Sequence, residues 1–168
     1  MIKNTILQIL LFSFTILSYA QTDDRMNSVI EETIDSWHHA ASEANFENYK
    51  NLMTENAVFI GTDPTEFWKG ETFLNFAKPY FDKGKAWSFT KLERHIFVDI
   101  NHEVAWFDEL LDTQMGICRG SGILLKVKNQ WKINHYVLSI TIPNENVKEV
   151  KALKERFDQK MIEKLSSK

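Results

Sequence analysis

The segment formed by residues 104–142 constrains the fold more than any other part of this 168-residue chain. Apolar and polar side chains alternate along it in three runs, with breaks near residues 112–116 and 128–130. Alternation with a period of two is typical of a strand that is buried on one face. Breaks this short join neighbouring antiparallel strands. We therefore predict three consecutive antiparallel strands in this segment.

The chain before this segment supplies helices and one further long strand. Apolar side chains recur every three or four positions in residues 28–44 and 71–81, which predicts two helices, and a shorter helix follows Asn45. Residues 57–60 form a short apolar strand, and residues 87–100 form a long alternating strand with room for a bulge. Early helices and late antiparallel strands indicate an α+β fold. A curved sheet wrapped on these helices forms a cone with one open end and a pocket inside.

A C-terminal extension follows Pro143. Residues 143–168 place apolar side chains at helical spacing among lysines and glutamates, which predicts an amphipathic helix. We expect this helix to dock on its own domain or on a partner subunit. Binding to a membrane surface is the alternative, and the mixed charge of the polar face disfavours it.

The first twenty residues have the pattern of a signal peptide. Lys3 precedes an apolar run over residues 6–17, and Ser18-Tyr19-Ala20 offers small side chains to a signal peptidase. We expect cleavage after Ala20, a flexible mature start over residues 21–27, and export to the periplasm or beyond. The alternative is an uncleaved membrane anchor, but the run is short of the roughly 20 residues that span a bilayer. No stable membrane insertion is expected after cleavage.

Composition narrows the classes of partner and cofactor. The formal net charge is −3, so nucleic acid is not an expected partner. Cys118 is the single cysteine, which excludes an internal disulfide. Its side chain is either a small buried hydrophobe or, in an exposed site of low pKa, a reactive thiol. The chain has no glycine-rich phosphate loop and no paired cysteines, so neither a cofactor nor a metal is implied.

Several short motifs resemble one family. They are Phe59-Ile60-Gly61-Thr62-Asp63-Pro64, Ala105-Trp106-Phe107-Asp108-Glu109, Cys118-Arg119-Gly120-Ser121-Gly122 and the closing Trp131-Lys132-Ile133-Asn134-His135. Over residues 28–142 the chain resembles the SnoaL-like domains of the nuclear transport factor 2-like superfamily. The resemblance implies a cone fold, a pocket inside it and a homodimer through the outer face of the sheet. Val137 stands where many members carry a second histidine, which weakens any mechanism that needs two.

Matching the family pattern divides the polar strand residues into two sets. The match places Trp106, Asp108, Asn134 and Tyr136 in the pocket, and places Glu109, Arg119, Ser121 and His135 on the outer, dimer-side face. Asp108 is the candidate general base, because a carboxylate among aromatic rings has a raised pKa. Trp68 and Arg94 complete the candidate ligand-binding set, Trp68 from a loop at the mouth and Arg94 as a clamp for a ligand carboxylate.

Each of these residues also has a purely structural interpretation. Asp108 could pair with a basic or hydroxyl neighbour, and Arg119 could pair with Glu109 rather than hold a ligand. His135 could be a hydrogen-bonded sheet residue rather than a base. We expect His38 and His39 to be solvated or half-buried helix residues, and because they are adjacent on the helix they do not form a natural metal pair.

Three functions remain open from sequence. The first is an exported domain that binds a small, partly hydrophobic organic molecule without catalysis. The second is a cofactor-free isomerase, cyclase, dehydratase or hydrolase with Asp108 as its base. The third is a structural dimerisation module.

Overall fold

The computed structural model describes residues 24–167, so the predicted signal peptide lies outside the described part of the chain. An N-terminal helix occupies residues 24–42 and thus includes the end of the segment expected to be flexible. Met26 packs against the core there, with its sulfur 3.2 Å from Nδ1 of His102. This contact accounts for helical structure before Ser28, where the helix was expected to begin.

The remaining elements confirm the predicted α+β class. The helices are α2 (Phe46–Asn51), α3 (Glu71–Asp82) and α4 (Val147–Ser166), with a 3-10 turn η1 (Asn144–Asn146) before α4. The strands are β1 (Met53–Ile60), β2 (Phe67–Lys69), β3 (Phe89–Val98), β4 (Val104–Thr113), β5 (Gly116–Val127) and β6 (Gln130–Ile140). β2 is an element that the sequence did not predict, since its three residues are too few to show a period.

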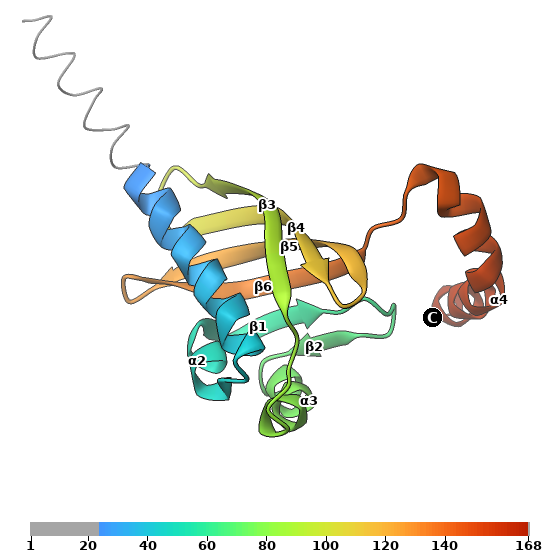
Figure 1. Ribbon diagram of the computed structural model, residues 1–168, viewed down its shortest axis with the longest axis horizontal. Coiled ribbons are helices and arrows are strands. Elements are labelled where there is room, and N and C mark those ends of the chain that lie inside the picture. The colour runs from blue at the N-terminus through green and yellow to red at the C-terminus, as the bar shows by residue number, and fades with distance from the viewer. Residues whose placement is uncertain (1–23, 168) are drawn as a thin grey trace, which may run out of the picture.

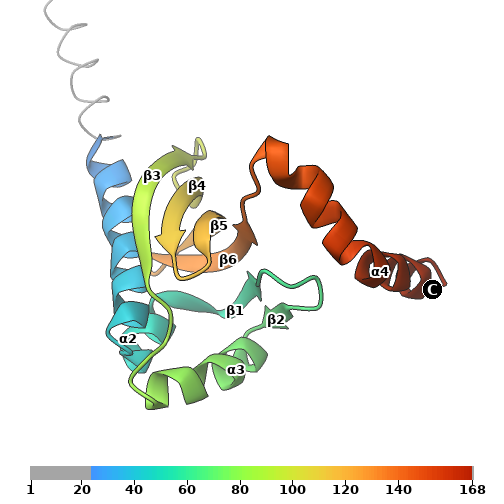
Figure 2. The same ribbon diagram turned by 45° about the vertical axis from the view of Figure 1, so that its right-hand side comes forward.

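The six strands form one curved, open sheet in the order β2-β1-β6-β5-β4-β3. All neighbours are antiparallel except β1 and β6, which run parallel. The N-terminal helix crosses the inner face of the sheet, and α3 lies beneath β1 and β2 (Figure 1; Figure 2). Ile30, Ile34 and Trp37 of that helix are fully buried against the sheet, which confirms the predicted cone around the N-terminal helices.

A bulge in β6 decides which of its side chains face inward. Ile133 pairs with Leu124 of β5, but the next pair joins His135 to Ile123, so Asn134 is an extra residue. An extra residue reverses the alternation on the bulged strand. Ile133 and Tyr136 are therefore both buried, although three positions separate them.

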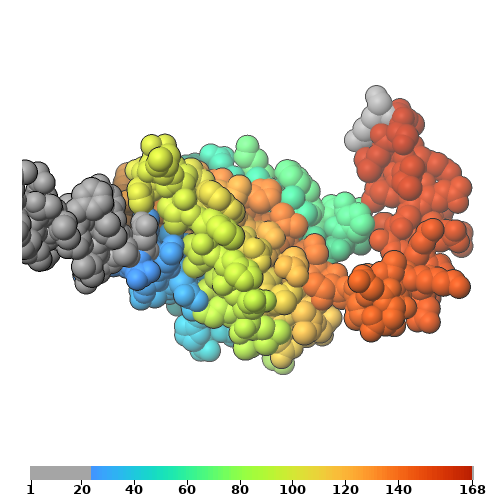
Figure 3. Space-filling model, turned by 90° about the horizontal axis from the view of Figure 1, so that it is seen from above, coloured from blue at the N-terminus to red at the C-terminus, as the bar shows by residue number. Residues whose placement is uncertain are grey.

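The helix α4 stands away from the cone. None of its residues is buried, and the space-filling view shows it projecting beside the main body (Figure 3). Within residues 24–167, the structure holds no helix of the length and apolar character that a membrane crossing requires.

Candidate functional site

The centre of the cone is organised around the carboxylate of Glu109. Glu109 lies on β4 between the buried residues Phe107 and Leu111, and it is 1% exposed. Its Oε1 atom is 2.8 Å from Nε2 of His38 and accepts a 2.9 Å hydrogen bond from the Tyr136 hydroxyl. Because an ionised carboxylate only accepts hydrogen bonds, Nε2 of His38 donates in this pair.

The second oxygen of Glu109 is held by Arg94. Nε and Nη2 of Arg94 donate to Oε2 at 2.9 and 2.7 Å. The Arg94 side chain is 1% exposed, and its Nη1 reaches Asp35 on the N-terminal helix at 2.7 Å. The ion pairs therefore join the helix to two strands, and Arg94 is committed to protein carboxylates rather than presented to a ligand.

The electrostatics of this cluster favour an ionised Glu109. Burial alone would raise the pKa of Glu109, but His38 and Arg94 outweigh it, and the pKa lies below its ordinary value. Burial, together with the charge of Glu109, raises the pKa of Tyr136 well above its ordinary value, so the phenol stays protonated and donates. With four donors on its two oxygens, Glu109 acts as a structural anchor, not as a free base.

Gly120 leaves the space in which Tyr136 and Glu109 meet. A Cβ atom added to Gly120 would collide with the Tyr136 hydroxyl and lie 2.9 Å from Cγ of Glu109. Gly120 pairs with Glu109 on one side and Leu138 on the other, so any side chain there would point into the cluster. The absence of a side chain at Gly120 is thus part of the site.

Three buried polar atoms in the same interior have no hydrogen-bond partner among the described residues: Trp37 Nε1, His38 Nδ1 and Tyr49 OH. The indole of Trp37 stacks on the ring of Tyr49 at 5.0 Å and lies 5.2 Å from the His38 ring. Buried polar groups nearly always have a hydrogen-bond partner, and a buried group without one costs about 1–3 kcal/mol of stability. These three residues line none of the cavities described below, so a molecule bound in one of those cavities would not contact the three atoms directly.

An aromatic cavity of about 120 Å³ lies at the open end of the cone. Its wall is built from β1, the β1–β2 loop, β2, α3, the start of β3 with the segment before it, the β4–β5 hairpin and β6. The lining residues are Phe59, Gly61, Thr62, Glu66, Trp68, Phe73, Phe76, Trp87, Phe89, Gln114, Met115 and Leu138. Stacking makes the wall rigid, since Phe59 lies 4.4 Å from Phe73 and Trp68 lies 4.2 Å from Phe76 between ring centres.

One layer of aromatic side chains separates the aromatic cavity from the residues that carry the unsatisfied polar atoms. Trp87, a wall residue, packs edge-on against Tyr49 with 5.6 Å between ring centres. Phe89, another wall residue, packs edge-on against His38 at 5.6 Å. A molecule in the cavity would thus have apolar rings around it and hydrogen-bonding groups directly behind them.

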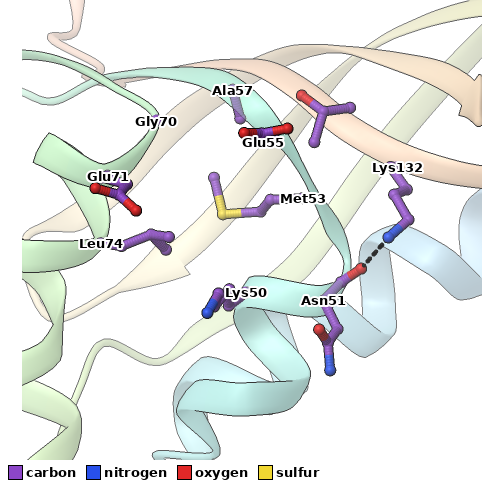
Figure 4. Close-up of a pocket in the computed structure, with 10 residues that line it drawn as sticks. Lys50, Asn51, Met53, Glu55, Ala57, Gly70, Glu71, Leu74 and Lys132 are labelled. Atoms are coloured by element: carbon purple, nitrogen blue, oxygen red, sulfur yellow. Dashed lines mark hydrogen bonds between the residues drawn. The ribbon is translucent and has the colours of Figure 1, made fainter.

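A second cavity, of about 240 Å³, lies outside the cone between α2, β1 and α3 (Figure 4). Met53 and Leu74 lie near its middle, and Lys132 at its edge donates to the backbone oxygen of Asn51 at 2.8 Å (Figure 4). Its charged lining residues are two lysines and two glutamates: Lys50, Lys132, Glu55 and Glu71. This balance selects neither an anion nor a cation, so the aromatic cavity is the better candidate site.

Two predicted pocket residues instead lie on the outer face of the sheet. Trp106 is 46% exposed and stacks on Phe97 with 5.8 Å between ring centres. The Asp108 side chain is 38% exposed, and its Oδ1 lies 3.1 Å from Nδ1 of His95 and 3.8 Å from Arg119. The expectation that Asp108 lies in an aromatic pocket is wrong, because Ala105, Phe107, Glu109 and Leu111 are the inward residues of β4.

The placement of Glu109 on the dimer-side face is wrong for the same reason. The other three residues expected there, Arg119, Ser121 and His135, do not contact the buried cluster: Arg119 is exposed near Asp108, and Ser121 and His135 line a shallow outer depression with Trp106. The suggested pairing of Arg119 with Glu109 is also wrong, since the ion pair of Glu109 is with Arg94.

The remaining predicted ligand residues divide between the cavity and the bulge. Trp68 lines the aromatic cavity. Tyr136 is inside the cone as expected, but its hydroxyl is given to Glu109. Asn134 is half-buried at the bulge, where its Oδ1 accepts a 2.9 Å hydrogen bond from Thr54.

His38 is the site residue that sequence reasoning missed. It is 6% exposed and bound to Glu109, although it was expected to be solvated or half-buried. The signal was present, because His38 follows Ile34 by four positions and precedes Ala41 by three, on the buried face of the helix.

On the outer face of the sheet, Asp108 lies between His95 and Arg119. The hydrogen bond and charge of Asp108 raise the pKa of the exposed His95 above its ordinary value.

In the part of the chain that the structure covers, no group of three or more His, Cys, Asp or Glu side chains is placed to hold a metal ion.

Solved structures with the same fold come from several bacteria. A candidate dehydratase of the nuclear transport factor 2-like (NTF2-like) family from Streptomyces avermitilis superposes with a TM-score of 0.63 at 10% identity, over 72% of this chain and 99% of that one. An NTF2-like protein of unknown function from Pseudomonas putida KT2440 gives 0.58 at 14% identity, over 71% and 89%. A candidate ketosteroid isomerase from Shewanella frigidimarina gives 0.57 at 16% identity, over 68% and 97%. At these identities the likeness shows the fold alone.

Sequence comparison gives the family. No curated protein matches the chain in sequence. The family model of the SnoaL-like domain matches residues 30–143, which include the whole sheet and most of the N-terminal helix. The chain therefore belongs to the family of SnoaL-like domains.

Proposed function

We propose that the cone binds a small, largely apolar organic molecule in the aromatic cavity at its open end. The observation that carries this proposal is the cavity itself, which is lined mainly by aromatic rings with Thr62, Glu66 and Gln114 as polar members. Ligand sites of this kind are concave and mostly apolar, with a few polar groups that set orientation. Catalysis by Asp108 has lost its support, since that carboxylate lies among polar outer-face neighbours.

The size of the cavity limits the ligand to about one ring. An apolar cavity of roughly 150 Å³ holds benzene, and this one measures about 120 Å³ with an open side. The polar members of the lining add a second criterion. Thr62 and Gln114 can each donate and accept, and the carboxylate of Glu66 can accept. A hydroxyl group can pair with either kind of partner, so the proposed class is a single-ring alcohol or phenol.

Phenol is therefore expected to bind more tightly than benzene, by roughly three- to tenfold, the value of one net hydrogen bond. Titration calorimetry of the two probes measures this ratio. Equal affinities in the unaltered protein would remove the hydroxyl from the proposed ligand class.

A blocking variant tests whether the cavity is the binding site. Thr62→Trp places a large ring at a half-buried position of the lining, and phenol affinity is expected to fall by about tenfold or more. Thr65→Trp is the matched control, since it lies in the same loop, is exposed and does not line the cavity. Asp108→Asn on the outer face is expected to leave binding unchanged. Loss of binding with Thr65→Trp or Asp108→Asn, but not with Thr62→Trp, would place the site elsewhere.

We further propose that this binding takes place outside the cytoplasm. The support is the pattern of residues 1–20 alone, with its apolar run and Ser18-Tyr19-Ala20. N-terminal sequencing of the protein recovered from expressing cells is expected to begin at Gln21. A chain that retains Met1 in the soluble intracellular fraction would contradict export.

A further inference from the structure

The helix α4 carries an apolar stripe that nothing within the described chain covers. Leu153, Phe157, Met161 and Leu165 follow one another at four-residue intervals and share one side of the helix. Leu153 is 87% exposed and Leu165 is 57% exposed. Because most helical stability in proteins comes from packing an amphipathic face, a 20-residue helix with this stripe needs an apolar partner surface.

A second uncovered apolar surface lies on the outer face of the sheet. It is a shallow groove of about 550 Å³ where β4, β5 and the end of β6 meet. Leu110, Ile117 and Ile142 supply its apolar lining, and Arg119 lies at its side. Ile117 is 49% exposed and Ile142 is 42% exposed, so the groove is open to solvent in the single chain.

We propose that α4 of one copy lies in this groove of a second copy, and that a two-fold dimer makes the contact twice. The stripe and the groove belong to one chain, yet α4 is directed away from the cone that carries the groove (Figure 2). Two copies always supply both surfaces in equal number, and a two-fold axis lets each helix meet the other copy's groove. The dimer is thus an exchange of C-terminal helices.

Charge supports this pairing. α4 contains five lysines and one arginine against three glutamates and one aspartate, so it is net positive. The charged lining residue of the groove is Arg119, and the outer strand positions around it carry Glu93, Asp108 and Asp112 beside His95, so acids still exceed bases by one when His95 is counted as a base. Surfaces of opposite net charge favour encounter and register of the two chains.

The area available also favours a double contact. A stable interface removes roughly 800 Å² from each partner. A helix of this length is about 30 Å long and 10 Å wide, so a single docked helix falls well short of that area. In the exchange, each copy contributes both its helix and its groove, so about 600 Å² is covered on each copy, which is closer to that area than a single docked helix gives.

Disulfide trapping between two differently tagged full-length chains tests the exchange. One chain carries Leu153→Cys and the other carries Ile117→Cys, and the native Cys118 is fully buried and so does not compete. We expect a mixed disulfide dimer, at several-fold higher yield than with Gln159→Cys, which lies on the opposite side of α4 and is the matched control.

Sedimentation supplies a second measurement. The unaltered protein is expected to sediment at twice the mass of one chain, and the combined Leu153→Glu and Phe157→Glu variant at the mass of one chain, with Gln159→Glu unchanged. A monomeric unaltered protein would overturn the exchange. A disulfide that forms only within a single chain carrying both Leu153→Cys and Ile117→Cys would also overturn it. So would a preference for disulfides between two Leu153→Cys chains over the mixed pair. Binding of the protein to lipid vesicles through α4 would be a third contradicting result.

Discussion

Replacing Glu109 with glutamine is expected to lower the free energy of unfolding by about 3–5 kcal/mol at pH 7. The side chain keeps its size, but the buried guanidinium of Arg94 loses its ionic partner and the new amide nitrogen faces other donors. Urea denaturation at neutral pH measures the loss. Asp108→Asn is the matched control, since it neutralises the neighbouring carboxylate on the outer face, and its expected change is at most about 1 kcal/mol.

The same variant has an expected signature in acid. The folded-state pKa of Glu109 lies below its ordinary value, so its contribution is fully present above the unfolded pKa, which is about 4.3. That contribution is lost as the pH falls through the folded pKa. The unaltered protein should therefore lose stability more steeply below about pH 4.3 than the Glu109→Gln variant does. Parallel acid profiles, or equal losses from Glu109→Gln and Asp108→Asn, would contradict a carboxylate-centred core.

Replacing Gly120 with alanine is expected to lower the free energy of unfolding by roughly 2–4 kcal/mol, from overpacking and a weakened buried hydrogen bond. The added methyl group collides with the Tyr136 hydroxyl and crowds Glu109, and both neighbours are held by other contacts. Thermal or urea unfolding measures the effect. Ser121→Ala, one position along on the outer side of β5, is the control and should change stability little.

A double variant identifies the physical cause. Tyr136→Phe removes the hydroxyl that meets the added methyl group, so Gly120→Ala combined with Tyr136→Phe should lose less stability than the two single losses added together. Strict additivity would show that the glycine is required for another reason, such as its backbone.

The fold was predictable because its signals are periodic. The helical spacing of Ile30, Ile34 and Trp37 predicts a buried helix face, and the structure confirms it. The alternation in residues 104–142 predicts strands with one buried face, and the structure confirms that too. The α+β class and the cone follow from those patterns, and the resemblance of the short motifs indicated the SnoaL-like family. The three-residue β2 gave no such signal, because its partner β1 defines it by tertiary pairing.

The division of site residues was less predictable, because alternation fixes two sets of side chains without saying which set faces inward. On β4, Trp106 and Asp108 were assigned to the pocket and Glu109 to the outside, whereas the structure places them the other way round. On β6 the bulge at Asn134 adds a residue, so no single alternation describes both ends of the strand. The ion pair of Arg94 with Glu109 joins residues 15 positions apart, and its partner choice depends on strand register.

A crystal structure of the protein soaked with phenol would locate the bound ring. We expect one ring bound between Phe59, Trp68, Trp87 and Leu138, with its hydroxyl on the side of the polar lining residues and the side chains of Glu109, Arg94 and Tyr136 unmoved. Phenol bound instead in the second cavity between α2, β1 and α3, or on the outer face beside Trp106, would contradict this binding site. So would an aromatic cavity closed by its own side chains.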